Sequence, residues 1–183
     1  VITNIELDHP DHYSSLDQVV AIFDQFVGQC ETVIGCLDCP TVRDRIKFDI
    51  SYSLEADSGA DYIATNVSEN ATGTTADIIE KGEKLGRITV PLLGRHNLGN
   101  ALASIAVARQ LGVSFDALVT HMPNFQGAKR RFEHRGFYNN ILFVDDYAHH
   151  PSEVKATLEA AQVQRGGELA AGVLSEGETR KVV

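Results

Sequence analysis

Short runs rich in β-branched residues alternate with helical stretches along this chain, and that alternation restricts its fold more than any other feature. The apolar stripe of residues 16–29 follows Ser15, and Gln18 lies three positions later, a spacing that predicts a helix opened by a capping box. Further helices are predicted at residues 97–111, 115–122 and 151–163. Strands are predicted at residues 1–5, 32–36, 50–54, 61–67, 75–80, 85–90, 132–137 and 141–144.

The order of these elements predicts an α/β fold. We expect a mostly parallel sheet flanked by helices, with an added β-hairpin whose turn lies at residues 81–84. After Pro123, residues 124–128 have the composition of a linker. We therefore expect a domain boundary there, with residues 1–126 in one domain and residues 127–183 in a second.

The chain is acidic, with 16 Lys and Arg against 25 Asp and Glu and a formal net charge of -9. This balance argues against a nonspecific nucleic-acid or anionic-membrane surface and favours small-molecule partners. No segment approaches the roughly 20 apolar residues that span a bilayer, and residues 1–9 lack the sections of a signal peptide, so we expect a cytoplasmic protein. Cys30, Cys36 and Cys39 lack a second ligand pair for a metal site, and we expect reduced thiols.

Polar side chains gather where the first predicted strand ends. Asp8, His9, Asp11 and His12 follow that strand closely, and α/β folds place ligand groups at strand exits. These carboxylates and imidazoles could bind a divalent cation, or they could form a solvated loop. The residues alone leave both interpretations open.

A second polar group opens the helix predicted at residues 97–111. Asn97 and Asn100 lie three positions apart on one helical face, and side-chain amides can both donate to and accept from a purine edge. The flanking Gly94 and Gly99 permit close approach of a ligand to the backbone. The alternative is that Asn97 only caps the helix.

Two further polar segments follow the linker. Residues 129–131, Lys-Arg-Arg, form a cationic patch that could grip phosphate or carboxylate, or could be a solvated hinge. Between a predicted strand and a predicted helix lie paired carboxylates and paired imidazoles: Asp145, Asp146, His149 and His150. Such pairs are costly as mere structure, so we favour a site in this segment.

Taken together and in this order, the four segments resemble the Mur ligases, ATP-dependent enzymes that build the peptide of bacterial cell-wall precursors. The resemblance rests on Thr3-Asn4-Ile5 with Asp8-His9, Gly94 with His96-Asn97 and Asn100-Ala101, Arg130-Arg131-Phe132-Glu133, and Asp145-Asp146-Tyr147-Ala148-His149-His150-Pro151. It implies that residues 1–126 are part of a central ATP-binding domain. Residues 127–183 would then begin a C-terminal ligase domain, with the first elements of a Rossmann-like α/β fold.

Within the family, the pattern is most similar to the branch that joins L-alanine to the carboxylate of UDP-N-acetylmuramate through an acyl phosphate, with ATP and Mg²⁺. The first lysine is Lys47, so no candidate follows His9 for the carbamylated lysine of other branches. Tyr147 favours this branch over the recycling ligases, which attach murein peptide to UDP-N-acetylmuramate and more often carry Phe there. A non-catalytic Mur-like binding module is the other alternative.

The resemblance also implies roles at the nucleotide. His9 would be a ligand of a magnesium ion, and Asn4 would lie near the same nucleotide site. His96, Asn97 and Asn100 would contact the adenine and ribose end of ATP.

The C-terminal segments would act nearer the reaction. By the same resemblance, Arg131 and Asp146 would serve the nucleotide phosphates and the cleft between the domains. His149 and His150 would position the substrate. The protein would mainly align the reactants and neutralise charge.

Some family features are not found in these 183 residues. The Gly-x-x-Gly-Lys-Thr/Ser loop and the UDP-sugar domain are missing, and the family places both before the position that matches Val1. We therefore expect a fragment that forms no product by itself. Residues 172–183 depart from the family's next strand, and Pro10 replaces a larger apolar residue.

Overall fold

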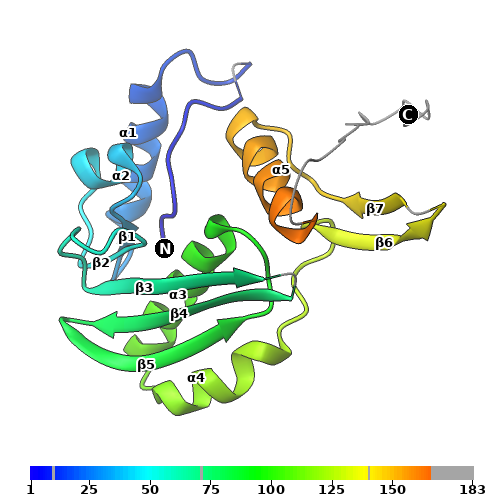
Figure 1. Ribbon diagram of the computed structural model, residues 1–183. Coiled ribbons are helices and arrows are strands. Elements are labelled where there is room, and N and C mark those ends of the chain that lie inside the picture. Colours follow the sequence, from blue (N-terminus) through cyan, green and yellow to red (C-terminus); the bar gives the residue numbers. More distant parts are fainter. Residues whose placement is uncertain (10, 71, 140, 166–183) are drawn as a thin grey trace.

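The computed structural model describes residues 1–9, 11–70, 72–139 and 141–165. Its larger sheet has five strands in the order β1-β2-β3-β4-β5 (Figure 1). They are β1 (Ile34–Cys36), β2 (Ile50–Ser53), β3 (Tyr62–Asn70), β4 (Gly73–Glu80) and β5 (Glu83–Val90). The β1–β2 and β2–β3 pairs are parallel, whereas β3, β4 and β5 form an antiparallel meander. The expected α/β fold is confirmed, and the predicted hairpin is the β4–β5 part of this meander.

Helix α3 (Arg95–Gln110) packs on this sheet. Its buried Leu98, Leu102 and Ile105 share one apolar cluster with strand residues such as Tyr52. Full burial of a Leu or Ile side chain contributes about 1.5–3 kcal/mol, so this interface is a main source of stability. Helix α4 (Phe115–His121) and the short helix η1 (Met122–Asn124) pack on β5.

A polar network fixes the C-terminal end of α3 to the sheet. The Arg109 guanidinium donates to both carboxylate oxygens of Glu80 at 2.9–3.3 Å. Tyr62 donates its hydroxyl proton to Glu80 and accepts a 3.1 Å hydrogen bond from Gln110. Burial and the Glu80 carboxylate raise the pKa of Tyr62 to about 12, so its hydroxyl stays protonated at neutral pH.

The N-terminal segment adds a second core with helices α1 (Leu16–Val27) and α2 (Pro40–Arg45). The predicted strand over residues 1–5 is wrong in extent, because pairing is limited to a parallel bridge between Ile2 and Gly35. Farther along, the Ile5 amide faces Cys39 Sγ at 3.4 Å instead of a strand. Burial of Ile2 and Ile5 against α1 nevertheless holds the segment in place.

The predicted start of α1 is confirmed, but its capping box forms only in part. Ser15 occupies the N-cap position, yet its side chain makes no capping hydrogen bond. The Gln18 side chain accepts a 2.9 Å hydrogen bond from the Ser14 amide, one residue earlier than expected. Of the two side-chain hydrogen bonds of a capping box, only the one accepted by Gln18 forms, and its donor, the Ser14 amide, lies just before the helix.

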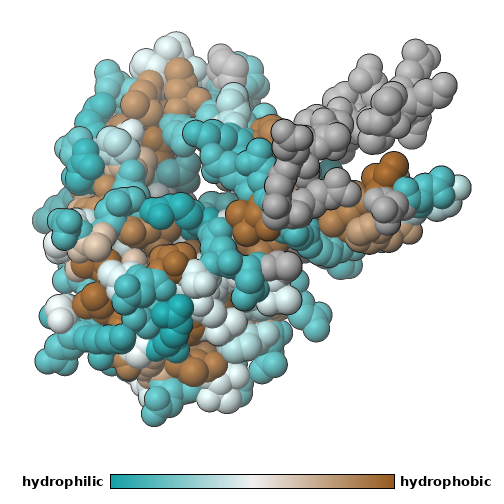
Figure 2. All heavy atoms as spheres, viewed as in Figure 1, coloured by the Kyte–Doolittle hydropathy of each residue, from teal (hydrophilic) through white to brown (hydrophobic). Residues whose placement is uncertain are grey.

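A second, two-stranded sheet and a helix follow η1. Strands β6 (Glu133–Tyr138) and β7 (Ile141–Asp145) are antiparallel, and α5 (Pro151–Arg165) packs against α3 and β3. Figure 1 shows α5 lying between the N-terminal segment and the β6–β7 pair. Apolar side chains of this pair, among them Phe137 and Phe143, are exposed. Figure 2 shows hydrophobic surface over the β6–β7 region. The boundary at residues 126/127 stays a prediction.

The three cysteines are free thiols, as expected. Among the described residues, no helix has the length and apolar character needed to cross a membrane. Pro10 and residues 172–183, which we singled out as departures, lie outside the described residues.

Candidate functional site

Two neighbouring cavities lie where the N-terminal segment and the start of α5 approach the sheet and α3. The larger has a volume of about 1100 Å³ and the smaller a volume of about 280 Å³. Four residues line both cavities: Asn4, Glu6, Ser152 and Glu153. The two cavities are therefore adjacent parts of one site.

The larger cavity gathers side chains that the sequence separates widely. Six predicted site residues line it: Asn4, His96, Asn97, Asn100, Arg131 and Asp146. They come from the N-terminal segment, the start of α3, and the loops that precede β6 and follow β7. The structure thus brings together all the predicted nucleotide contacts, whose roles remain predictions.

The turn before α3 directs these side chains. Gly94 has a φ of +89°, and a Cβ at this position would lie 3.0 Å from the His96 ring, so the turn requires glycine. Desolvation lowers the pKa of His96; the Asp146 carboxylate opposes that shift and Arg131 adds to it. The imidazole is therefore mostly neutral at pH 7 and can accept a hydrogen bond.

Asn97 is not the cap of α3. The N-cap residue is Gly94, and the Asn97 amide donates a 2.8 Å hydrogen bond to the Leu93 carbonyl oxygen. The capping alternative is therefore wrong. That bond orients the Asn97 amide, which has a second N–H and a carbonyl oxygen for other partners. The exposed Asn100 lies nearly one turn farther along the cavity wall.

Asp146 connects the two loops that enter the site from the β6–β7 side. One carboxylate oxygen accepts the Phe132 amide at 2.8 Å, and the other accepts the Ala148 amide at 2.8 Å. Arg131 directly precedes Phe132 and lines the larger cavity, with Nη1 3.7 Å from a Glu153 carboxylate oxygen. The Arg131 side chain is 53% exposed, so its charge faces open space.

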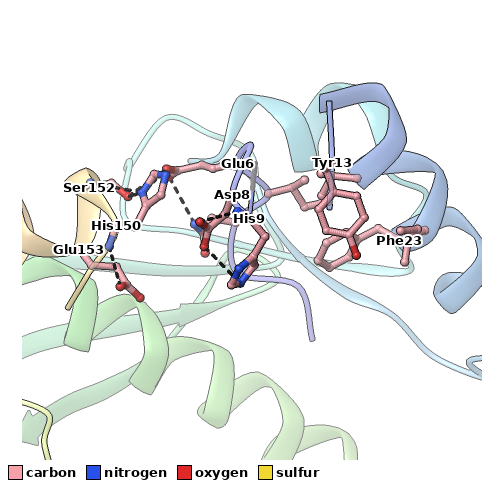
Figure 3. A pocket seen from close by; sticks show the side chains of 12 residues that line it. Glu6, Asp8, His9, Tyr13, Phe23, His150, Ser152 and Glu153 are labelled. Atoms are coloured by element: carbon pink, nitrogen blue, oxygen red, sulfur yellow. Dashed lines mark hydrogen bonds and ion pairs between the residues drawn. The ribbon is translucent and has the colours of Figure 1, made fainter. Parts of the chain in front are cut away.

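The smaller cavity has a polar side and an apolar side, both visible in Figure 3. Glu6, His150 and Ser152 converge at one end, with Asp8 and His9 between them and the apolar wall (Figure 3). That wall is formed by Ile5, Tyr13, Val19, Ile22 and Phe23. The cavity therefore combines charged and polar groups with an apolar wall, as sites that bind and orient small ligands do.

Asp8 and His9 could supply ligands to Mg²⁺. His9 has a φ of +54°, its amide donates a 2.7 Å hydrogen bond to Asp8, and its Nε2 lies 3.7 Å from Asp8 Oδ2. The backbone hydrogen bond from His9 lowers the pKa of Asp8, so its carboxylate is charged at neutral pH. Among the described residues, no three His, Cys, Asp or Glu side chains form a metal-binding group. One carboxylate and one imidazole fit an open Mg²⁺ site that phosphate and water would complete.

The two predicted histidines occupy different positions. His150 lines the smaller cavity, whereas His149 is absent from the linings of both cavities and stacks edge-on against Tyr147. Both backbone amides donate to the Glu153 carboxylate, at 3.2 and 3.4 Å, and so begin α5. Burial raises the pKa of Glu153, but these amides and Arg131 outweigh it and lower the pKa overall.

Sequence reasoning missed three polar residues of the site. Glu6, Ser152 and Glu153 line both cavities, yet none was assigned a role from the sequence. Glu6 lies inside the first polar segment, and Ser152 and Glu153 directly follow the last one. Their position next to the predicted polar segments could have marked them as candidates. Only the fold, however, shows that the first and last segments lie side by side.

Two family models match this chain. Residues 1–108 match the Mur ligase middle domain, and residues 130–182 match the Mur ligase, glutamate ligase domain. The second match includes most of the tail that we expected to depart from the family.

Individual proteins agree with the family models. The UDP-N-acetylmuramate--L-alanine ligase of Gloeothece citriformis is 54% identical over 164 residues, which cover 90% of this chain and 33% of the relative. The chain therefore spans about a third of the length of such relatives.

Solved structures share the fold. The UDP-N-acetylmuramate-alanine ligase of Thermotoga maritima superposes with a TM-score of 0.74 at 24% identity, covering 88% of this chain and 37% of that one. The MurF ligase of Thermotoga maritima in complex with ADP gives a TM-score of 0.71 at 19% identity, covering 88% and 38%.

Proposed function

The chain belongs to the Mur ligase family, and from that premise we propose that it is part of an ATP-dependent ligase that joins L-alanine to UDP-N-acetylmuramate in the cytoplasm. It would carry the later part of the middle domain, residues 1–126, and the start of the C-terminal domain, residues 127–183. One observation supports the proposal most strongly: a single cavity collects six predicted nucleotide contacts from both parts.

At the adenine end, α3 would provide recognition. The Asn97 amide is already oriented by Leu93, so it can present its remaining groups to a purine edge with little loss of side-chain entropy. Asn100 would contact the same end of the nucleotide, and the mostly neutral His96 would accept a hydrogen bond beside it.

At the phosphate end, Arg131 would neutralise charge. Asp146 accepts hydrogen bonds from the backbone amides of Phe132 and Ala148. These bonds hold the loop that carries Arg131 and so limit the positions that its guanidinium can reach. Asp8 and His9 would hold Mg²⁺, which would supply charge stabilisation to the phosphate oxygens. His150 would orient the substrate from the opposite side of the smaller cavity. The chemistry would thus depend on alignment and electrostatics.

The proposal is tested with the complete ligase, meaning a protein that carries these residues within the full length of its relatives. It should form an amide from UDP-N-acetylmuramate, ATP and L-alanine, and little product when L-alanine is replaced by the murein tripeptide. The 183-residue chain alone should form none. Preference for the tripeptide would favour a recycling ligase, and no product with either amine would favour a binding module.

A further inference from the structure

A polar contact joins the N-terminal segment to the start of α5, two regions 146 residues apart in sequence. The Ser152 hydroxyl donates a 2.9 Å hydrogen bond to Glu6 Oε2. His150 Nδ1 lies 3.2 Å from the same oxygen and 2.7 Å from Ser152 Oγ (Figure 3). The other Glu6 oxygen accepts a 3.3 Å hydrogen bond from the Asn4 amide, so both oxygens have partners.

The contact combines one carboxylate, one hydroxyl and one imidazole. Ser152 has one hydroxyl proton and gives it to Glu6, so its oxygen can only accept from His150. The 2.7 Å contact is a hydrogen bond to Ser152 Oγ in the tautomer with a proton on Nδ1, which also points toward Glu6. In the other tautomer, Nδ1 accepts the Ser152 backbone amide at 3.4 Å. The Glu6 carboxylate makes the hydrogen bond that it accepts from Ser152 charge-assisted.

The contact lies where the two cavities meet, because Glu6 and Ser152 line both of them. The next residue, Glu153, accepts hydrogen bonds from the backbone amides of His149 and His150, just before α5. One of its carboxylate oxygens lies 3.7 Å from Arg131 Nη1. Any movement of the start of α5 would therefore move the partner of Arg131.

We propose that Glu6, His150 and Ser152 form a clasp that holds α5 against the N-terminal segment and so positions Arg131 and His150 over the reactants. Glu6 and Ser152 are positioning residues, because they act through α5 and not on the substrate, whereas His150 is both held by the clasp and directed at the substrate. The clasp itself rests on the contact geometry, whereas its effect on catalysis rests on the proposed function.

Hydrogen exchange of the 183-residue chain tests the clasp without any activity measurement. Loss of a charge-assisted hydrogen bond shifts a local opening equilibrium by about tenfold or more. Glu6→Ala should therefore speed exchange at the amides of His150 and Val154, and Ser152→Ala should speed exchange at the Ile5 amide. The double variant should exchange no faster than the faster single variant. Glu83→Ala, which removes an exposed carboxylate from the β4–β5 turn, should change neither region.

Kinetics of the complete ligase test the consequence. Glu6→Ala should lower kcat by about tenfold and change the KM for ATP by less than about threefold, because it alters alignment without removing a nucleotide contact. Glu6→Gln, which keeps two polar atoms in the same shape, should recover part of kcat.

Two results would overturn the clasp. The first is faster hydrogen exchange only around the substituted residue in each single variant, with no change in the opposite segment. The other is a thermal melt that falls in both Glu6 variants with no long-range exchange effect, since that would make Glu6 a local structural residue. If exchange behaves as expected but the complete ligase forms no amide, the clasp stands and the proposed function fails.

Discussion

Several side chains of the site already have protein partners, and these partners decide what each residue can still do. Asp146 uses both oxygens on backbone amides, so its main work in this structure is to shape the loops around Arg131. Asn97 uses one amide hydrogen on Leu93 and keeps the rest for a ligand. Residues with the same predicted role therefore divide into those that anchor the site and those that face its interior.

His9 is the residue with the most specific expected chemistry. Replacing it by Ala or Asn in the complete ligase should lower kcat by about two orders of magnitude, because a positioned metal ligand is lost. His9→Ala removes every ligand atom, whereas His9→Asn tolerates the positive φ of +54° better and so separates backbone strain from loss of the imidazole. The measurement is turnover against Mg²⁺ concentration, and the curve should shift to higher concentrations.

His12→Ala is the matched control for this test, because His12 is 72% exposed and its side chain contacts its sequence neighbours Asp11 and Tyr13. It should leave the Mg²⁺ curve in place. Should the His9 variants keep the wild-type metal dependence and melt at a lower temperature, His9 would be a structural residue of the loop.

Two glycines of the α3 region should respond oppositely to the same substitution. Gly94→Ala places a methyl group 3.0 Å from the His96 ring at a φ of +89°, and should destabilise the fold by about 1–2 kcal/mol. Gly99 is helical, and its added Cβ would meet only Leu54 at 3.8 Å, so Gly99→Ala should stabilise by about 0.5–1 kcal/mol. Urea unfolding of both variants measures the difference, and equal effects would contradict the turn argument.

At the scale of elements, the spacing of apolar residues in the sequence predicted the longer helices correctly. The stripes of α1 and α3 were visible because their buried positions recur at helical spacing. Residues 1–5 were predicted as a strand because β-branched residues favour strands. Pairing also depends on the edge of a neighbouring strand, and among these residues only Ile2 forms such a bridge. Contacts such as Glu6 with Ser152 depend on tertiary packing, which no local pattern encodes.

The meander carries a charge network of its own. Asp77 on β4 accepts hydrogen bonds from Lys84 and Asn66 at 2.8 Å and from Arg87 at 3.3 Å. The Lys84 hydrogen bond, followed by that from Asn66, lowers the pKa of Asp77 to about 2. A group with a depressed folded-state pKa stabilises the fold above its ordinary pKa of 3.8, and this contribution is lost as pH falls toward 2.

Asp77→Asn should therefore reduce the free energy of unfolding at pH 6, and the difference from the unsubstituted chain should shrink between about pH 4 and pH 2. Urea unfolding across this range measures it. Asp57→Asn, in the exposed turn before β3, is the control and should show no such convergence. A difference that stays constant with pH would mean that the network does not depend on the Asp77 charge.

At the scale of the whole molecule, the site forms where two parts of the chain, the sheet with α3 and the region from β6 to α5, lie next to each other. The start of α3 supplies His96, Asn97 and Asn100, and the loops around β6–β7 and α5 supply Arg131 and His150. Neither part holds all the predicted groups. This arrangement explains why alignment of the two parts, and not any one reactive side chain, is central to the account.

The most direct test of that account is calorimetric titration of ATP into the complete ligase. Asn100→Ala should weaken ATP binding by about fivefold, the equivalent of one neutral hydrogen bond, while UDP-N-acetylmuramate binding stays unchanged. Asn124→Ala, the same substitution on η1 outside both cavity linings, should leave ATP binding unchanged. An unchanged ATP Kd in both Asn100→Ala and Asn97→Ala would contradict the assignment of the larger cavity to the nucleotide.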